Sequence, residues 1–431
     1  MPSTATQTIH DVLAATITLL AVALALALLV GHLRRRRPGL RIGVPVATAL
    51  VLRVLAAAGV SLLPIASTLR GGDELAFTGR ASLTAQTPFG SPDWIDALVH
   101  DLHEFVFALQ YLVLDSPEFA LRIGQAGIAV VALVLLAAAV HELAGGRAAW
   151  LAAWLLALEP AGIFFSTLLH KESIMILAAA LVAYGGAVLW KHADLRDLAV
   201  MALGCGLALA TRPYAGWFLI AAAAAISLHA GLRARREASV RSLVLVAAIV
   251  LLAAISAPTI LEASTDENLE KNLQGSQEAN AADEEANLSL ERVDFSTRSA
   301  IITNLPIRIW DVLLRPYPWQ VGSASQQVAV VGTLFFLVAM VLLVRCLTRN
   351  RGAIMERAGP FLYVGAFLLV AYALSTGNAG TAFRYRTQVV ALGICALAAL
   401  WYMGVRADKR AARPEPPPAA TRWRRPVPAI D

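Results

Sequence analysis

Long apolar runs alternate with short polar clusters along this chain, and the runs are long enough to predict membrane-spanning helices. A helix needs about 20 apolar residues to cross a bilayer, and it satisfies its own backbone hydrogen bonds there. The runs are too long for the strands of a barrel. We therefore predict an all-α polytopic membrane protein with about eleven transmembrane helices. They are expected at residues 12–33, 43–66, 118–140, 148–168, 173–190, 197–211, 214–232, 241–261, 327–346, 358–375 and 387–404.

Basic residues set the expected direction of these helices across the membrane. The first run is followed by Arg34 to Arg37, and cytoplasmic loops are enriched in Lys and Arg. With this cluster inside, the N-terminus lies outside, and every later inner loop again carries basic residues. The polar clusters at 71–74, 170–172, 211–214, 262–294, 315–319 and 384–386 then all fall on the outer face.

Two outer segments are longer than turns. In the first, Trp94 to Leu114 predicts an interfacial helix on the outer leaflet. In the second, Ile301 to Trp319 predicts a re-entrant or interfacial segment. The expected organisation is an N-terminal anchor helix, retained rather than cleaved, with a basic cytoplasmic loop (1–42), a membrane core (43–261) with its first outer loop (67–117), an acidic outer loop with the interfacial segment (262–326), C-terminal membrane helices (327–405), and a disordered, basic, proline-rich cytoplasmic tail (406–431).

Composition agrees with a membrane protein and excludes other classes. Hydrophobic residues make up 58% of the chain and charged residues 15%, which is too apolar for a soluble protein of this length. The net charge of +6 comes from the inner loops and tail, so no nucleic-acid partner is expected. Cys205, Cys346 and Cys395 fall within or at the end of apolar runs, which argues against disulfides or a zinc site built on them.

Asp73 and Glu74 are the first candidates for chemistry. They follow the second predicted span, behind Gly71 and Gly72, in what the pattern predicts to be a loop. Paired carboxylates can hold a divalent cation or take a proton from an acceptor hydroxyl. The pair is therefore a candidate catalytic site and, if a metal is used, the candidate ligand set for Mg²⁺ or Mn²⁺. The alternative is a pair of solvated loop acids.

The segment Gly72 to Ala81 resembles a known motif. It is similar to the Asp-Glu-x-x-Tyr-x-x-x-Ala pattern in the first large outer loop of the GT-C superfamily, with Phe77 at the tyrosine position. These are polytopic glycosyltransferases that use polyprenyl-phosphate-linked sugars. The resemblance implies that Asp73 is the catalytic base.

A second resemblance follows the fourth predicted span. Glu159-Pro160, Ser166 and Lys171-Glu172 are similar to the Pro-x-x-x-x-x-Ser-x-x-x-x-Lys-Glu stretch of related membrane glycosyltransferases and polysaccharide polymerases. It implies a catalytic Glu172 that faces Asp73 across an outer cavity. Lys171 can bind a phosphate as a point charge. Alternatively, both residues simply cap the next helix.

Thr211 to Tyr214 interrupts an apolar stretch and predicts an outer hairpin. An arginine close to hydrocarbon usually has a partner or a ligand, and a guanidinium matches the oxygens of a lipid phosphate. Arg212 and Tyr214 are therefore candidate substrate-binding residues. Arg53 lies well inside the second predicted span and must pair internally.

Two later segments add candidates. Gly377 to Arg386 resembles the Gly-Thr-x-x-Arg-Tyr-Arg segment of bacterial glycosyltransferase and O-antigen-polymerase-like chains. Arginines at a helix N-terminus suggest a bound anion, although they can also snorkel. Arg315 to Gln320 is similar to the Pro-x-Pro-Trp segment of the same chains, and its tryptophan stacks on a sugar or, more commonly, sits in the aromatic belt. The substrate-binding candidates from these segments are Arg315, Trp319, Arg384, Tyr385 and Arg386, and we expect Arg212, Arg384 and Arg386 to share one lipid phosphate.

No Walker loop, dinucleotide-binding loop or zinc-protease motif is present in the sequence, so the sugar donor is expected to arrive in the membrane. We expect transfer of a hexose or pentose from a polyprenyl-phosphate-linked donor to a cell-envelope glycan, lipid or protein acceptor, on the outer face of a bacterial cytoplasmic membrane. One alternative is a repeat-unit polymerase or ligase that uses polyprenyl diphosphate donors. Another is a transporter or flippase for lipids or solutes.

Overall fold

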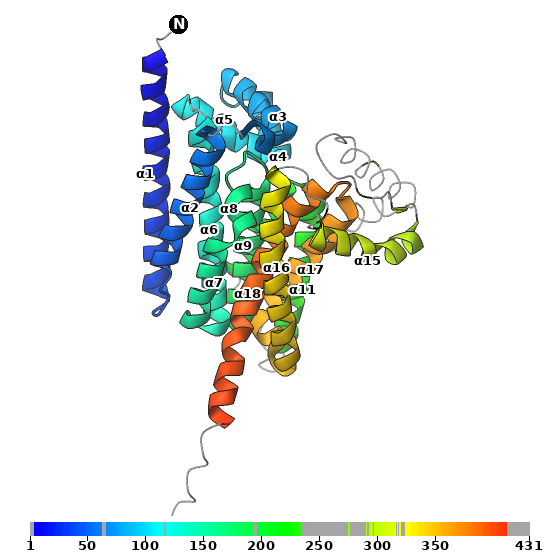
Figure 1. Cartoon of the computed structure of the whole chain (residues 1–431). Helices are drawn as coiled ribbons and strands as arrows, with labels where there is room; N and C mark the ends of the chain where they lie inside the picture. The colour runs from blue at the N-terminus through cyan, green and yellow to red at the C-terminus, as the bar shows by residue number, and fades with distance from the viewer. Residues whose placement is uncertain are drawn as a thin grey trace, which may run out of the picture.

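The computed structural model describes residues 4–62, 66–115, 118–192, 196–234, 275, 290, 293–295, 297–315, 317, 319 and 324–411. In this part of the chain all regular elements are helices, with no strand (Figure 1). The predicted all-α fold is therefore confirmed. The predicted span at 241–261, most of the acidic loop and most of the C-terminal tail lie outside the described residues.

Eight of the described helices are long and apolar enough to cross a membrane. They coincide with all but three of the predicted spans, so the chain is a multi-pass membrane protein. These helices are α1 (Thr4–Arg36), α2 (Gly43–Leu62), α6 (Glu118–Ala144), α9 (Glu172–His192), α11 (Pro213–Ala234), α16 (Ala324–Arg349), α17 (Ile354–Ser375) and α18 (Ala379–Ala411).

Two predicted spans take a different form. Residues 148–168 do not form one helix but two, α7 (Gly146–Leu158) and α8 (Pro160–Phe165). The break is at Glu159, which has extended backbone and whose carboxylate accepts from the N–H groups of Ala161 and Gly162, so it caps α8. The span at 197–211 is α10 (Arg196–Leu209), which at 14 residues is shorter than a bilayer-crossing helix.

The centre of the bundle is made by α6, α9 and α18, while α1 and α16 lie on its outside (Figure 1). The inner helices are rich in Ala and Gly, which let backbones approach closely. At Gly204 of α10, for example, an added Cβ would lie 2.6 Å from the carbonyl oxygen of Ala178 in α9. The outer helices expose leucines and valines such as Leu24 and Val341, as expected for surfaces that face lipid.

The first outer loop is more helical than its sequence predicts. The expectation of a loop around Gly71 and Gly72 is wrong, because both lie in α3 (Ala66–Gln86). A glycine in a helix costs only about 1 kcal/mol relative to alanine, and contacts of Glu74 with the bundle offset that cost. The predicted interfacial helix is also two helices, α4 (Pro92–His100) and α5 (Leu102–Leu114), separated at Asp101. Together α3, α4 and α5 cover one end of the bundle (Figure 1).

The late segment predicted to be interfacial contains α15 (Arg298–Leu314), which begins at the capping residue Thr297. This helix lies across the direction of the bundle helices rather than along it (Figure 1). A short helix, η4 (Arg351–Ala353), joins α16 to α17 at the opposite end. The orientation of α15 agrees with the predicted interfacial segment.

Candidate functional site

Asp73 and Arg384 form an ion pair between α3 and α18. Arg384 Nη1 donates to Asp73 Oδ2 over 3.1 Å. The side chain of Asp73 is 47% exposed, whereas that of Arg384 is 18% exposed. Asp73 therefore combines a fixed position with access from outside, as a group that exchanges protons with a substrate requires.

A second ion pair lies deeper. Arg212, between α10 and α11, donates from Nη2 to Glu172 Oε1 over 2.7 Å, and both side chains are buried. The guanidinium of Arg212 also lies over the ring of Tyr385 at 4.3 Å. In the described part of the chain, Glu172 Oε2 has no hydrogen-bond partner. Buried polar atoms are normally paired, so this carboxylate retains a free acceptor.

His170 lies close enough to both ion pairs to interact with their charges, and the sequence did not single it out as a site residue. It is buried directly before α9 and interacts electrostatically with Arg384, Glu172 and Asp73. Burial, followed by the positive charge of Arg384, lowers the pKa of His170 to about 4. The imidazole is therefore neutral near pH 7. Its place in the His-Lys-Glu cluster was the signal that could have identified it.

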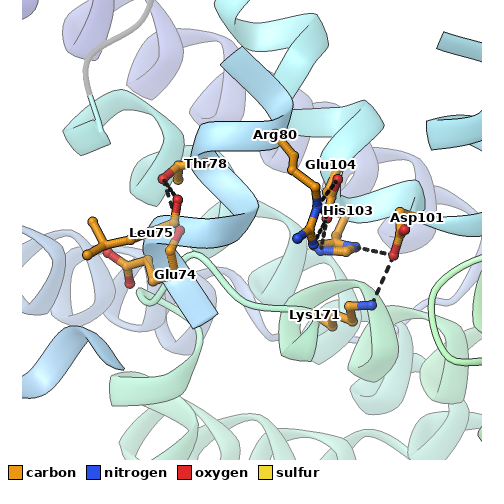
Figure 2. Close-up of polar contacts among 8 residues, drawn as sticks. All are labelled: Glu74, Leu75, Thr78, Arg80, Asp101, His103, Glu104 and Lys171. Carbon is orange, nitrogen blue, oxygen red and sulfur yellow. Dashed lines mark hydrogen bonds and ion pairs between the residues drawn. The ribbon is translucent and has the colours of Figure 1, made fainter. Parts of the chain in front are cut away.

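Lys171 turns toward α4 and α5. Its Nζ donates to Asp101 Oδ1 over 3.1 Å (Figure 2) and lies 5.4 Å from the centre of the Phe77 ring. Phe77, at the position of the motif's tyrosine, is therefore one wall of this region. Because Lys171 remains partly exposed, its ammonium group is accessible to a ligand at the N-terminal end of α9.

Glu74 has a different environment from Asp73. Its carboxylate is buried and accepts from both terminal nitrogens of Arg122 in α6 and from the backbone N–H of Leu169. Consecutive residues of a helix do not face the same way. The two acids therefore do not converge on one cation, and the geometry gives Glu74 a structural role in attaching α3 to the bundle.

Arg386 does not join Arg384. It is fully buried and donates to the carbonyl oxygen of Leu313 in α15 and, over 2.7 Å, to Thr333 Oγ1 in α16. Its guanidinium lies 4.6 Å from the ring centre of Phe383. The expectation that Arg386 shares a phosphate with Arg212 and Arg384 does not fit this geometry, because its donors hold three helices together.

The other substrate-binding candidates lie in two different parts of the structure. Tyr214 and Tyr385 lie beside Arg212 at the buried side of the site. Arg315 instead pairs with Asp311 Oδ1 over 2.9 Å. Trp319 is 79% exposed and stacks on Tyr317 with ring centres 4.8 Å apart.

A cavity of about 50 Å³ is lined in part by Glu172. Its polar lining includes Arg53, Glu159 and Ser166, and it has room for a water molecule. Arg53 donates to the carbonyl oxygens of Ala49 and Leu156, so its predicted internal pairing is confirmed. The cavity therefore has other polar groups in its lining besides the buried carboxylate.

Among the residues that the structure describes, the group that could hold a metal ion is Asp101, His103 and Glu104. Asp73 and Glu74 are not part of it. Any cation-binding role for those two acids stays a prediction from the sequence.

Comparison with known proteins gives one finding. Residues 102–260 match a family model described as dolichyl-phosphate-mannose-protein mannosyltransferase. No curated protein and no solved structure matches the chain. The matched segment includes His170, Lys171, Glu172 and Arg212, whereas Asp73 and Arg384 lie outside it.

This family is one of the GT-C superfamily of membrane glycosyltransferases. The match therefore confirms the resemblance that the short motifs indicated. Together with the helical fold, it shows that the chain is similar to the polytopic membrane glycosyltransferases of GT-C type over residues 102–260.

Proposed function

We propose that this protein transfers a single sugar, a hexose or a pentose, from a polyprenyl monophosphate donor to a cell-envelope glycan, lipid or protein acceptor on the extracytoplasmic face of the membrane. The family description, which names dolichyl phosphate mannose, supports this class of donor and makes mannose the first sugar to test. The ion pair of Asp73 with Arg384 is the observation on which the proposal depends.

In the proposed step, the acceptor oxygen attacks the anomeric carbon of the donor. A new C–O bond forms to the acceptor, and the bond from the anomeric carbon to the phosphate oxygen breaks. The acceptor proton passes to the carboxylate of Asp73, and polyprenyl phosphate leaves with the bonding electrons. Asp73 suits this role because its side chain is accessible and fixed in position.

Arg384 would change partner during this cycle. Without substrate it donates to Asp73, and an arriving phosphate offers it a second anionic partner with a matching geometry. When Arg384 turns to the phosphate, the carboxylate of Asp73 loses a cation and becomes a stronger base. Donor binding and base activation are then the same event.

Glu172 and Arg212 form the buried side of the proposed site. The carboxylate holds Arg212 in position through the 2.7 Å contact, so that this arginine can stabilise the negative charge of the leaving phosphate. Lys171 supplies a further positive charge at the rim once it leaves Asp101. Tyr214 and Tyr385 enclose the guanidinium of Arg212 and keep water from it.

The donor class is tested with the full-length protein in proteoliposomes. Radiolabelled polyprenyl monophosphate mannose, other polyprenyl monophosphate hexoses and pentoses, and a polyprenyl diphosphate sugar are each supplied with membrane extract as the acceptor source. We expect labelled product and free polyprenyl phosphate only with a monophosphate donor. Turnover of the diphosphate donor alone would replace the proposal with the polymerase or ligase alternative.

A further inference from the structure

Three potential metal ligands meet where α4 joins α5, beside Lys171. Asp101 occupies the break between the helices, and His103 and Glu104 lie in the first turn of α5 (Figure 2). One ligand atom from each residue lies within 4.8 Å of the other two. His103 Nε2 is 3.6 Å from Glu104 Oε1, and His103 Nδ1 is 4.0 Å from Asp101 Oδ1.

A single ion can bind only one ring nitrogen of His103, so the separation that applies to one site is the 4.8 Å limit for one ligand atom from each residue. Ligand atoms of a tetrahedral zinc ion lie about 3.3 Å apart, given metal–ligand distances of about 2.0–2.2 Å. Binding of one ion therefore requires the three side chains to rotate toward one another from the 4.8 Å limit. The ligands come from adjacent positions of one chain segment, so no rearrangement of the bundle is needed.

His103 is the most informative member of the group. It is fully buried, and neither ring nitrogen has a hydrogen-bond partner in the described part of the chain. Buried polar atoms without a partner require an explanation. A neutral imidazole with a free ring nitrogen is able to bind a metal.

Two cations already contact the carboxylates of this group. Arg80 donates to both oxygens of Glu104, and Lys171 donates to Asp101. The side chain of Arg80 is 52% exposed, so it can remain as an outer partner of a ligating carboxylate without closing the site. The side chain of Lys171 is also partly exposed.

We propose that Asp101, His103 and Glu104 bind one divalent transition-metal ion, for which zinc is the best match. A neutral imidazole combined with carboxylates is a donor set that zinc accepts readily, whereas Mg²⁺ prefers oxygen ligands alone. The site is separate from Asp73 and does not depend on the proposed transfer reaction. It stabilises the α4–α5 break, which is attached to the bundle by the hydrogen bond from Leu102 N to Ala210 O.

The test is metal binding by the purified full-length protein after treatment with a chelator. Zn²⁺ is titrated against a competing fluorescent indicator, and bound zinc is counted by elemental analysis. We expect one zinc per chain, with affinity reduced at least about tenfold in His103→Gln and in Asp101→Asn. The matched control is His100→Gln, because His100 is exposed and pairs with Asp96 within α4. The zinc affinity of this variant should equal that of the wild type.

X-ray absorption at the zinc edge provides a readout that needs no variant. The spectrum of the wild-type protein should show one imidazole nitrogen among oxygen ligands. Absence of stoichiometric zinc, a shell without imidazole, or unchanged affinity in a folded His103→Gln protein would overturn the proposal. If His103→Gln does not fold, the half-exposed Asp101→Asn variant decides in its place.

Discussion

Asp73 and Arg384 lie 311 positions apart in the chain, yet their side chains meet over 3.1 Å. The contact brings the first acidic motif of the sequence to the start of the last described helix. It also joins the two candidate groups, a base and a phosphate ligand, that the proposed reaction requires side by side.

Asp73→Asn should reduce sugar transfer by a factor of about 10²–10⁴, the usual contribution of a general base. The amide keeps the shape of the side chain and a hydrogen bond, so the melting temperature should change little. Product formation in proteoliposomes measures the effect. Asp96→Asn is the matched control, because Asp96 is an exposed acid on α4. Near-normal turnover by Asp73→Asn would remove Asp73 from the mechanism.

Arg384→Lys and Arg386→Lys should have different effects, although the two arginines are two positions apart. Arg384→Lys should weaken donor binding by about 1–3 kcal/mol, because lysine keeps the charge but loses the guanidinium fork. Arg386→Lys should leave donor affinity unchanged and lower the melting temperature, since Arg386 joins α18 to α15 and α16. Measurements of binding of a non-hydrolysable donor analogue and of thermal unfolding distinguish the two effects. A loss of donor affinity in both variants would mean that both arginines reach the phosphate.

Replacement of Glu74 by glutamine should act on stability rather than on chemistry. The change removes the buried carboxylate partner of Arg122 and leaves, among the described residues, only the partly exposed Glu118, 3.7 Å away; breaking comparable buried pairs costs about 3–5 kcal/mol. We expect a lower melting temperature with donor affinity retained in the folded fraction. Loss of transfer at an unchanged melting temperature would instead assign Glu74 to the reaction.

The stability of the protein should fall as the pH is lowered from about 6.5 to about 4. His170 has its pKa lowered to about 4 in the folded state, whereas an unfolded histidine has a pKa of about 6.5. The unfolded state therefore binds more protons in this window, and the stabilising effect of the neutral imidazole is complete only above pH 6.5. Melting temperatures at several pH values should show a shallower decline for His170→Gln than for the wild type. An identical decline in both proteins would exclude His170 as the group responsible.

The site end of the bundle should be extracytoplasmic. A single cysteine at Asp93, in the first turn of α4, should react with an impermeant thiol reagent in intact cells, and one at Gly352, in η4 at the other end, should not. The native cysteines are buried and should give little background. The reverse labelling pattern would overturn the predicted topology and the proposed face of action.

The apolar pattern predicts most of the fold because a membrane helix is specified largely by its own length and hydropathy. The pattern fails where a side-chain cap or a tertiary contact decides whether a helix ends or continues. Glu159 caps a new helix inside an apolar run, and Gly71 and Gly72 lie inside a helix whose polar face is held by partners distant in sequence.

For the candidate site, too, the sequence predicts some features and not others. Short motifs identify Asp73, Lys171, Glu172, Arg212 and Arg384, which all lie at one end of the bundle. They do not show that Arg384 and Arg386, or Asp73 and Glu74, have different roles. Side chains at neighbouring helical positions point in different directions and therefore contact different partners. Arg122 and Thr333, which determine the environments of Glu74 and Arg386, are far from them in the sequence.

The position of Arg384 on α18 also has a consequence for biosynthesis. Every other described helix is synthesised and inserted before this one, so an emerging chain presents Asp73 at the membrane long before its cationic partner exists. The pairing between α3 and α18 can form only after α18 has inserted. A ribosome-bound or truncated chain that ends before residue 379 therefore lacks the arginine proposed to bind the lipid phosphate.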